Sequence, residues 1–210
     1  MLGTIQDITE QKVAEETLAH RALHDDLTGL ANRALLLDRL ARVLAHGRST
    51  TVAVIFLDLD RFKWGNDSLN HSAGDKLLVA VARALESALR ATDTLARFGG
   101  DEFVVLCEQV GGPGEVLDIV DRLAERLTQP FALEGQDLVV SASMGVALAL
   151  SGTGVDADEL IRDADTAMYR AKKLGRARVE MSTSRCAVGP HALSSHSGVS
   201  GVRPAGPPPW

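Results

Sequence analysis

The sequence predicts an α+β fold, in which helices pack on one side of a single sheet that is mostly antiparallel. Helical and strand-like segments alternate along the chain, and two short apolar stretches, residues 95–98 and 103–106, are separated by Gly99 and Gly100. Paired glycines supply the positive φ that tight turns require, so these two stretches are expected to form a hairpin. Hairpin strands are antiparallel, which favours an antiparallel sheet.

Each of the other elements has its own signal. Asn32 can cap a helix of leucines at helical spacing, which Gly47 ends. Residues 51–57 are a β-branched and apolar run short enough to be a buried strand, and residues 74–89 have helical apolar spacing. The signals after the hairpin are a helix with apolar positions from Val116 to Leu127, a strand pair turning at residues 134–136, a helix with apolar positions from Leu160 to Ala171, and a short strand.

The two ends of the chain differ from its centre. Residues 182–210 contain six Ser, five Pro, four Gly and no acidic residue, which predicts a disordered tail. Residues 8–22 have a thin apolar stripe after Asp7, a helix cap; this pattern suits a connecting helix or, equally, a surface helix. We therefore divide the chain into a linker over residues 1–21, a folded domain over residues 22–181 and the tail.

Charge and composition exclude several classes of function. The net charge is −6 for the whole chain and −8 for residues 1–181, whereas binding to a nucleic-acid backbone needs a surplus of Lys and Arg. Aromatic residues make up only 4%, too few for a base-stacking platform. We expect no membrane segment and no signal peptide. Cys107 and Cys186 give no disulfide framework, so a cytoplasmic location is expected.

Three carboxylates follow predicted strands. Asp58 ends the run at residues 51–57, and Asp101 and Glu102 follow the glycine pair. If the hairpin flanks the first strand, Asp58 and Asp101 approach one another and repel unless a cation lies between them. Solvated turn acids are the alternative interpretation. The cation site gains support from the glycine pair, whose backbone a phosphate can approach closely, and from three candidate phosphate partners, which are Lys63, Lys172 and Arg176.

Five blocks of the sequence resemble the GGDEF family, the diguanylate cyclases. The signature block is residues 97–103, which read RFGGDEF. The other blocks read HDDLTGLANR from residue 24, DLDRFKWGNDSLNHSAGD from residue 58, SASMGVA from residue 141 and DADTAMYRAKKLGR from residue 163. They follow the family's order over about residues 22–181, and five ordered blocks are far more specific than one pentapeptide.

The resemblance implies both a fold and a reaction. The fold is that of the nucleotide-cyclase and polymerase palm, a ferredoxin-like, mostly antiparallel sheet with surrounding helices. The reaction condenses two GTP molecules into cyclic di-GMP and two pyrophosphates at a homodimer interface, with Mg²⁺, or alternatively Mn²⁺, as cofactor. A GGDEF domain that binds cyclic di-GMP or GTP without turnover is an alternative, and so is a related cyclase that also accepts ATP.

The resemblance also implies roles for individual residues. The implied metal ligands are Asp58, Asp101 and the backbone carbonyl of Leu59, and the implied catalytic acids are Asp101 and Glu102. The implied substrate-binding residues are Asn66 and Asp75 for the guanine edge, Leu78 for the base pocket, Phe62, Lys63, Lys172 and Arg176 for the phosphates, and His71, Gly99 and Gly100. Alternatives remain open for two of these residues, because Lys172 fits a solvated helix face and Phe62 fits a core aromatic.

Two further features belong to the same resemblance. Arg90 and Asp93 match the family's RxxD inhibitory site, which implies feedback by the product; a surface ion pair at a helix end is the alternative. Residues 3–18 resemble the end of a PAS sensor domain and its linker helix. The sequence also departs from the family at Asn70 and at Trp64-Gly65, which puts the placement of Asn66 on the base in doubt, and we do not expect Asp60 to be a metal ligand.

Overall fold

The computed structural model describes residues 20–46, 49–60, 62, 71–133 and 135–183. The elements are α2 (Arg33–His46), β1 (Thr51–Leu59), α4 (His71–Glu86), β2 (Thr94–Gly99), β3 (Glu102–Val110), α5 (Pro113–Thr128), β4 (Phe131–Leu133), β5 (Gln136–Leu138), β6 (Ala142–Leu150), α6 (Ala157–Lys173) and β7 (Val179–Met181). The predicted alternation is confirmed with one correction. The strand pair predicted around residues 134–136 is the small β4–β5 hairpin, and β6 is a separate, longer strand.

The main sheet has five strands in the order β2-β3-β1-β6-β7. β1 lies at its centre and pairs antiparallel with β3 on one side and with β6 on the other. The predicted hairpin is present as the antiparallel pair β2 and β3, and only the short β7 is parallel to its neighbour. The sheet is therefore mostly antiparallel, as predicted.

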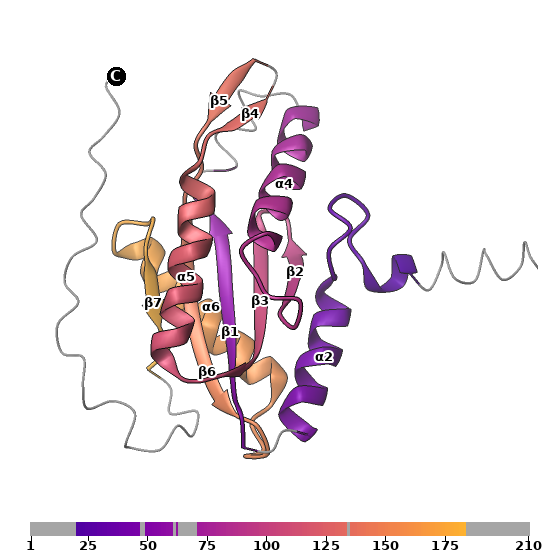
Figure 1. Ribbon diagram of the computed structural model, residues 1–210, viewed down its shortest axis with the longest axis vertical. Helices are drawn as coiled ribbons and strands as arrows, with labels where there is room; N and C mark the ends of the chain where they lie inside the picture. Colours follow the sequence, from indigo (N-terminus) through magenta and orange to yellow (C-terminus); the bar gives the residue numbers. More distant parts are fainter. Residues whose placement is uncertain (1–19, 47–48, 61, 63–70, 134, 184–210) are drawn as a thin grey trace, which may run out of the picture.

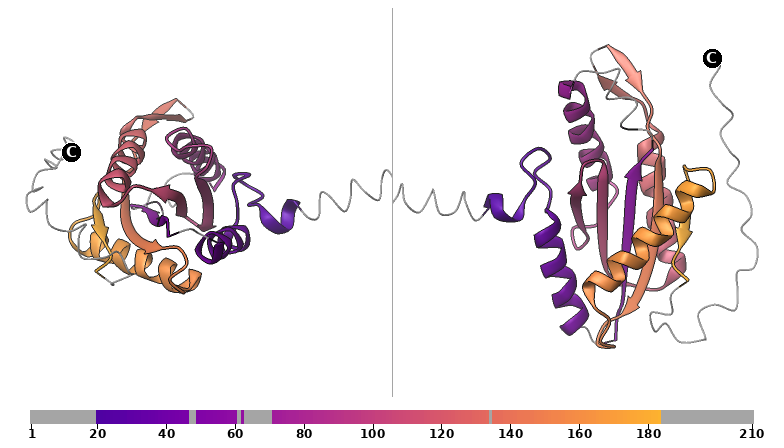
Figure 2. Two further views of the ribbon diagram at one scale, coloured as in Figure 1. Left: turned by 60° about the horizontal axis from the view of Figure 1, so that its bottom comes forward. Right: turned by 180° about the vertical axis from the view of Figure 1, so that it is seen from behind.

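Helices cover both faces of this sheet, so the prediction that they pack on one side is wrong (Figure 1). α4 and α5 lie on one face, and α2 and α6 lie on the other (Figure 2). β1 shows the reason, because all residues from Val52 to Leu59 are buried. Alternate residues of this strand enter two separate apolar clusters, one under each pair of helices. A continuous apolar run is typical of a strand that is buried on both faces.

α6 lies directly against β6, and Gly145 makes this contact possible. A Cβ atom at Gly145 would lie 2.1 Å from the carbonyl oxygen of Ala164 and 2.1 Å from the amide nitrogen of Met168. The backbones of helix and strand therefore meet without a side chain between them. This close contact fixes the position of the helix that carries Lys172.

The segment before α2 is tied to the β2–β3 turn. Asn32 caps α2 as predicted, since its Oδ1 accepts a hydrogen bond from the amide of Leu35 at 3.1 Å. Arg97 donates two hydrogen bonds to the carboxylate of Asp25 and two to the carbonyl of Gly100.

Some predictions concern residues that the structure describes only in part. The helix expected over residues 8–22 lies mostly outside the described residues, of which 20–23 are helical, and so do Gly47 and the tail from residue 184. Among the described residues, no helix has both the length and the apolar character that crossing a membrane requires.

Candidate active site

Acidic side chains meet where β1 ends beside the β2–β3 turn. Asp58 lies opposite Glu102 in the β1–β3 ladder, and the amide of Leu59 donates to the carbonyl of Asp101 at 3.2 Å. The sequence-based expectation that Asp58 and Asp101 approach one another is therefore confirmed. Asp58 is only 7% exposed, which does not fit a solvated turn acid.

The electrostatics of this cluster favour a bound cation. Burial raises the pKa of Asp58, and the neighbouring Asp101 and Asp60 add to this effect, while Lys172 opposes it. Burial also raises the pKa of Glu102, with further contributions from Asp58, Asp165 and Asp101. Several negative charges thus share a site with little solvent, and a cation would relieve their repulsion.

The donor set fits a hard divalent ion. Carboxylate and carbonyl oxygens are the ligands that Mg²⁺ prefers, usually together with substrate phosphates. Asp58, Asp101 and the carbonyl of Leu59 offer such oxygens. Among the described residues, no group of three or more His, Cys, Asp or Glu side chains is arranged to hold a metal. An ion held here would therefore also need main-chain, water or substrate oxygens.

The C-terminal end of α6 brings basic side chains to the same sheet edge. The Nζ of Lys172 lies 2.6 Å from Oδ2 of Asp58, and its side chain is 26% exposed. Lys172 is thus not on a solvated helix face. Arg176 follows in a turn in which Gly175 has φ +120° and the amide of Arg176 bonds the carbonyl of Ala171. Such a strongly positive φ directly after a helix is a conformation that glycine adopts most easily.

The residues expected to bind guanine are described only in part. Asp75 is exposed near the start of α4, and Leu78, also on α4, is 3% exposed within the core. Phe62 packs against the apolar cluster under α4 and α5, which agrees with its alternative reading as a core aromatic. Lys63 and Asn66, the side chain of His71, and the departures at Trp64, Gly65 and Asn70 lie outside the described residues.

The glycine pair forms an exposed turn beside an open cavity. Gly100 has φ +44°, a conformation that glycine adopts most easily. Both glycines line a cavity of about 590 Å³ together with Arg97 and Phe98 of β2, with Asp25, and with residues at the start of α2. Burial alone would raise the pKa of Asp25, but hydrogen bonds from Thr28 and Arg97 outweigh this effect and lower it.

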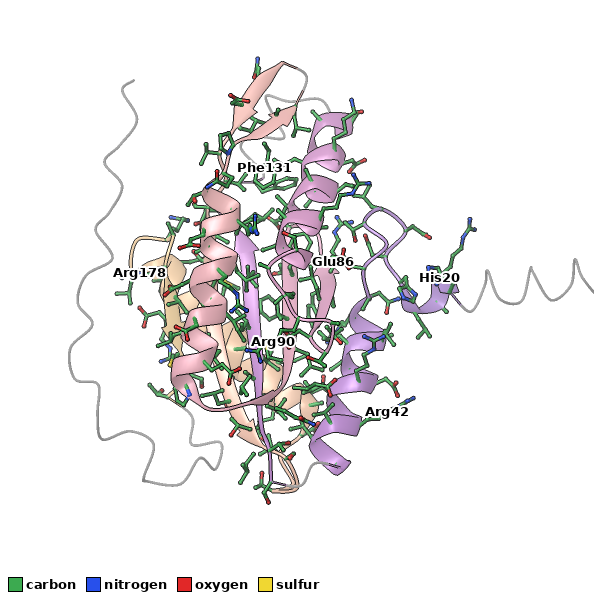
Figure 3. The ribbon with its side chains drawn as sticks, in the orientation of Figure 1. His20, Arg42, Glu86, Arg90, Phe131 and Arg178 are labelled. Atoms are coloured by element: carbon green, nitrogen blue, oxygen red, sulfur yellow. The ribbon has the colours of Figure 1, made fainter. Side chains whose placement is uncertain are left out.

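Arg90 and Asp93 lie at the other end of β2, in the loop that follows α4. The amide of Arg90 donates to Oδ2 of Asp93 at 3.0 Å, whereas the guanidinium of Arg90 lies 2.6 Å from Oε1 of Glu115 on α5. Figure 3 labels Arg90 in this position. Glu115 raises the pKa of Arg90. The surface ion pair that was the alternative interpretation therefore exists, but its acid is Glu115, which the RxxD spacing does not reveal.

Comparisons with known proteins identify the family of the chain. The family model described as "Diguanylate cyclase, GGDEF domain" matches residues 22–178. An uncharacterised signalling protein from Caulobacter vibrioides is 45% identical over 179 residues, which cover 82% of this chain and 22% of that protein. The diguanylate cyclase TpbB from Pseudomonas aeruginosa is 37% identical over 195 residues, which cover 91% of this chain and 44% of TpbB. The chain thus spans less than half the length of these relatives.

Solved structures of GGDEF domains share the fold. The isolated GGDEF domain of TpbB matches with a TM-score of 0.71 and 38% identity, covering 76% of this chain and 94% of that domain. The GGDEF domain of DgcB from Caulobacter crescentus, solved in complex with c-di-GMP, matches with a TM-score of 0.69 and 27% identity, covering 78% of this chain and 97% of that one. The sequence blocks, the sheet and these matches together show that the chain belongs to the GGDEF domain family of diguanylate cyclases.

Proposed function

We propose that this chain is a diguanylate cyclase, which condenses two GTP molecules into cyclic di-GMP with release of two pyrophosphates. The observation that carries the proposal is the meeting of Asp58 and Asp101 with Lys172 at one sheet edge. Acids that attract a divalent cation and bases that neutralise phosphates are the two groups that nucleotidyl transfer needs. The diguanylate cyclase TpbB, a relative across most of this chain, supports the same activity.

The side chains have separate tasks in substrate binding. Lys172 and Arg176 neutralise the terminal phosphates, with Phe62 and Lys63 at the turn that wraps them. Asn66 and Asp75 read the guanine edge, Leu78 lines the base pocket, and His71, Gly99 and Gly100 complete the site. When bound to Asp58, Asp101 and the Leu59 carbonyl, Mg²⁺, or Mn²⁺, supplies charge neutralisation and lowers the pKa of the attacking hydroxyl.

The reaction requires two domains. The 3′-hydroxyl of one GTP attacks the α-phosphorus of the other, a phosphorus–oxygen bond forms, and the bond to pyrophosphate breaks in line. Asp101, with Glu102 beside it, helps to take the proton of the hydroxyl. Because each domain holds one GTP, two copies of the chain must face each other, and a second attack closes the ring.

The product also binds at Arg90 and Asp93 and inhibits the enzyme. An arginine fork and a carboxylate suit the phosphate and guanine groups of cyclic di-GMP. This site lies beyond the far end of β2 from Gly99, so inhibition couples two distinct sites.

The test is to incubate the purified chain with GTP and Mg²⁺ and to separate the nucleotides. We expect cyclic di-GMP, formed at a rate per molecule that rises with protein concentration. Asp101→Ala should lower this rate by about a hundredfold or more, whereas Asp118→Ala on the exposed face of α5 should not. Absence of product at high protein concentration would overturn the proposal. Deletion of residues 1–20 should lower both the activity and the dimer population, since we propose that this linker sets the dimer geometry.

A further inference from the structure

We infer that Asp60 is a positioning residue, whose buried carboxylate fixes the turn that carries Arg176 and so sets where this guanidinium meets the triphosphate. The inference rests on the proposed function, because it concerns the phosphate-binding arginine of the proposed GTP site. Asp60 lies two residues after Asp58 in the same D-x-D pattern. The surroundings of these two acids assign them different tasks.

The carboxylate of Asp60 joins three segments of the chain. It follows β1, and its side chain is only 4% exposed. Its Oδ1 accepts a hydrogen bond from the hydroxyl of Ser143 at 2.7 Å, and its Oδ2 accepts one from the hydroxyl of Ser141 at 2.8 Å. Oδ2 also accepts the amide of Ala177 at 3.0 Å. One side chain thus connects the end of β1, the start of β6 and the turn between α6 and β7.

That turn has an unusual backbone that needs support. Gly175, Arg176 and Ala177 have φ values of +120°, +63° and +47°, and residues other than glycine rarely adopt this region. Hydrogen bonds from two consecutive amides hold the turn. The amide of Arg176 bonds the carbonyl of Ala171 at the helix end, and the amide of Ala177 bonds Asp60. Without Asp60, the second of these amides loses its acceptor.

Asp60 also acts on the arginine itself. The Nε of Arg176 lies 4.0 Å from Oδ1 of Asp60, and the Arg176 side chain is 52% exposed. The carboxylate therefore attracts the inner part of a guanidinium that also meets solvent. Fixing the turn and attracting Nε both reduce the freedom that Arg176 must lose when it binds phosphate.

The two acids of the D-x-D pattern differ in what they contact. Asp58 faces Lys172 and the other acids of the site. Both oxygens of Asp60 are engaged by donors from the protein, and one of the donors, Ser143, is completely buried. A buried carboxylate with this set of donors is a structural anchor. The serines of the SASMGVA block serve this anchor.

The test measures binding without turnover. The full chain is titrated with 3′-deoxy-GTP, which has no attacking hydroxyl, and with GMP, which lacks the β- and γ-phosphates, both in Mg²⁺. The variants are Asp60→Ala, Asp60→Asn, Arg176→Gln and the double variant Asp60→Ala/Arg176→Gln. Asp118→Asn on α5 is the matched control, and thermal unfolding shows which variants are folded.

We expect Asp60→Ala to weaken the binding of 3′-deoxy-GTP by about tenfold and that of GMP by less than about twofold. Asp60→Asn keeps an acceptor for Ala177 and should restore binding to within about threefold of the parent. The double variant should bind no more weakly than Arg176→Gln alone, because the two residues act as one unit. If Asp60→Ala does not fold, Asp60→Asn carries the test, because its neutral amide no longer attracts Nε of Arg176 and should cost about two- to threefold in 3′-deoxy-GTP affinity with no loss for GMP.

Three results would overturn the inference: unchanged affinity in the folded Asp60 variants, equal losses for GMP and 3′-deoxy-GTP, or losses that add in the double variant. A parent chain that does not bind 3′-deoxy-GTP would instead overturn the proposed function, and the inference with it. The two failures are therefore distinguishable.

Discussion

Arg97 is the residue that connects the N-terminal segment to the glycine turn. Its guanidinium makes four hydrogen bonds, two to Asp25 and two to the carbonyl of Gly100. The side chains of Arg97 and Asp25 are mostly buried, with 14% and 24% of their surfaces exposed, respectively. Arg97→Ala should therefore lower the free energy of unfolding by roughly 1–3 kcal/mol, measured by urea denaturation at pH 7.

The stabilisation that the Arg97–Asp25 pair provides should depend on pH, and the direction of this dependence follows from the pKa of Asp25. The pKa of Asp25 in the folded protein is held below its ordinary value of 3.8. The stabilisation is therefore fully present above pH 3.8, and it is lost as the pH falls through the lowered pKa of the folded protein. The difference between the parent and Arg97→Ala should shrink at pH 2. An equal loss at both pH values would show that Asp25 contributes nothing to it.

Glu115 competes with any ligand for Arg90. It pairs with this guanidinium at 2.6 Å, and its other oxygen accepts the amide of Gly111 at 2.6 Å. If cyclic di-GMP binds at Arg90 and Asp93, this ion pair must open first. Glu115→Gln should therefore tighten product binding by about two- to fivefold, the range expected of an exposed ion pair.

Calorimetric titration with cyclic di-GMP checks this prediction, with Arg90→Ala as the variant that should lose binding. Weaker binding by Glu115→Gln would show that Glu115 supports the ligand instead of competing with it. Unchanged binding in both variants would place the product elsewhere.

At the scale of elements, the contact between α6 and β6 holds Lys172 beside Asp58. A methyl group at Gly145 would collide with the backbone of α6, and a helix backbone cannot turn aside as a side chain can. Gly145→Ala should therefore destabilise the protein by about 1–3 kcal/mol or more and should lower GTP binding, since α6 must move.

The matched control is Gly114→Ala in the first turn of α5, where the added methyl group meets nothing within 4 Å. This variant should be neutral or up to about 1 kcal/mol more stable, because alanine favours a helix. Thermal unfolding and GTP binding compare the two. Equal effects of both substitutions would contradict the close-contact argument.

The elements also show how far local sequence reasoning reaches. The hairpin, the Asn32 cap and the approach of Asp58 to Asp101 depend on turn chemistry and on neighbouring strands, and these were predicted. The packing of helices on both faces was not, although the unbroken apolar run of β1 is the signal for it. Glu115 is distant in sequence from its partner Arg90, and no local pattern reveals such a contact.

At the scale of the whole molecule, an acidic domain is proposed to bind a polyanion. The net charge of −6 includes acids gathered at one sheet edge, where burial and mutual repulsion raise the pKa of Asp58 and Glu102. In the absence of a cation these acids destabilise the fold when they are ionised. If the site binds Mg²⁺ as proposed, the repulsion that lowers the stability of the ligand-free fold also provides the negative charge that attracts the ion.

The unfolding temperature of Glu102→Gln at different pH values tests whether repulsion among these acids lowers the stability of the metal-free protein. Glu102 has a pKa raised above its ordinary value of 4.5 in the folded protein, so its contribution to stability is present below 4.5 and is lost as the pH rises through the raised value. Without Mg²⁺, Glu102→Gln should unfold about 1–3 °C higher than the parent at pH 8, because Glu102 is partly exposed and its repulsion is screened. At pH 4 the two proteins should unfold at the same temperature.

Mg²⁺ with 3′-deoxy-GTP should reduce the difference in unfolding temperature at pH 8, because the bound cation offsets the repulsion that the substitution removes. A lower unfolding temperature for Glu102→Gln at pH 8 would mean that the carboxylate stabilises the ligand-free fold. Repulsion among the acids would then not lower the stability of the metal-free protein, which would contradict the argument for a cation site.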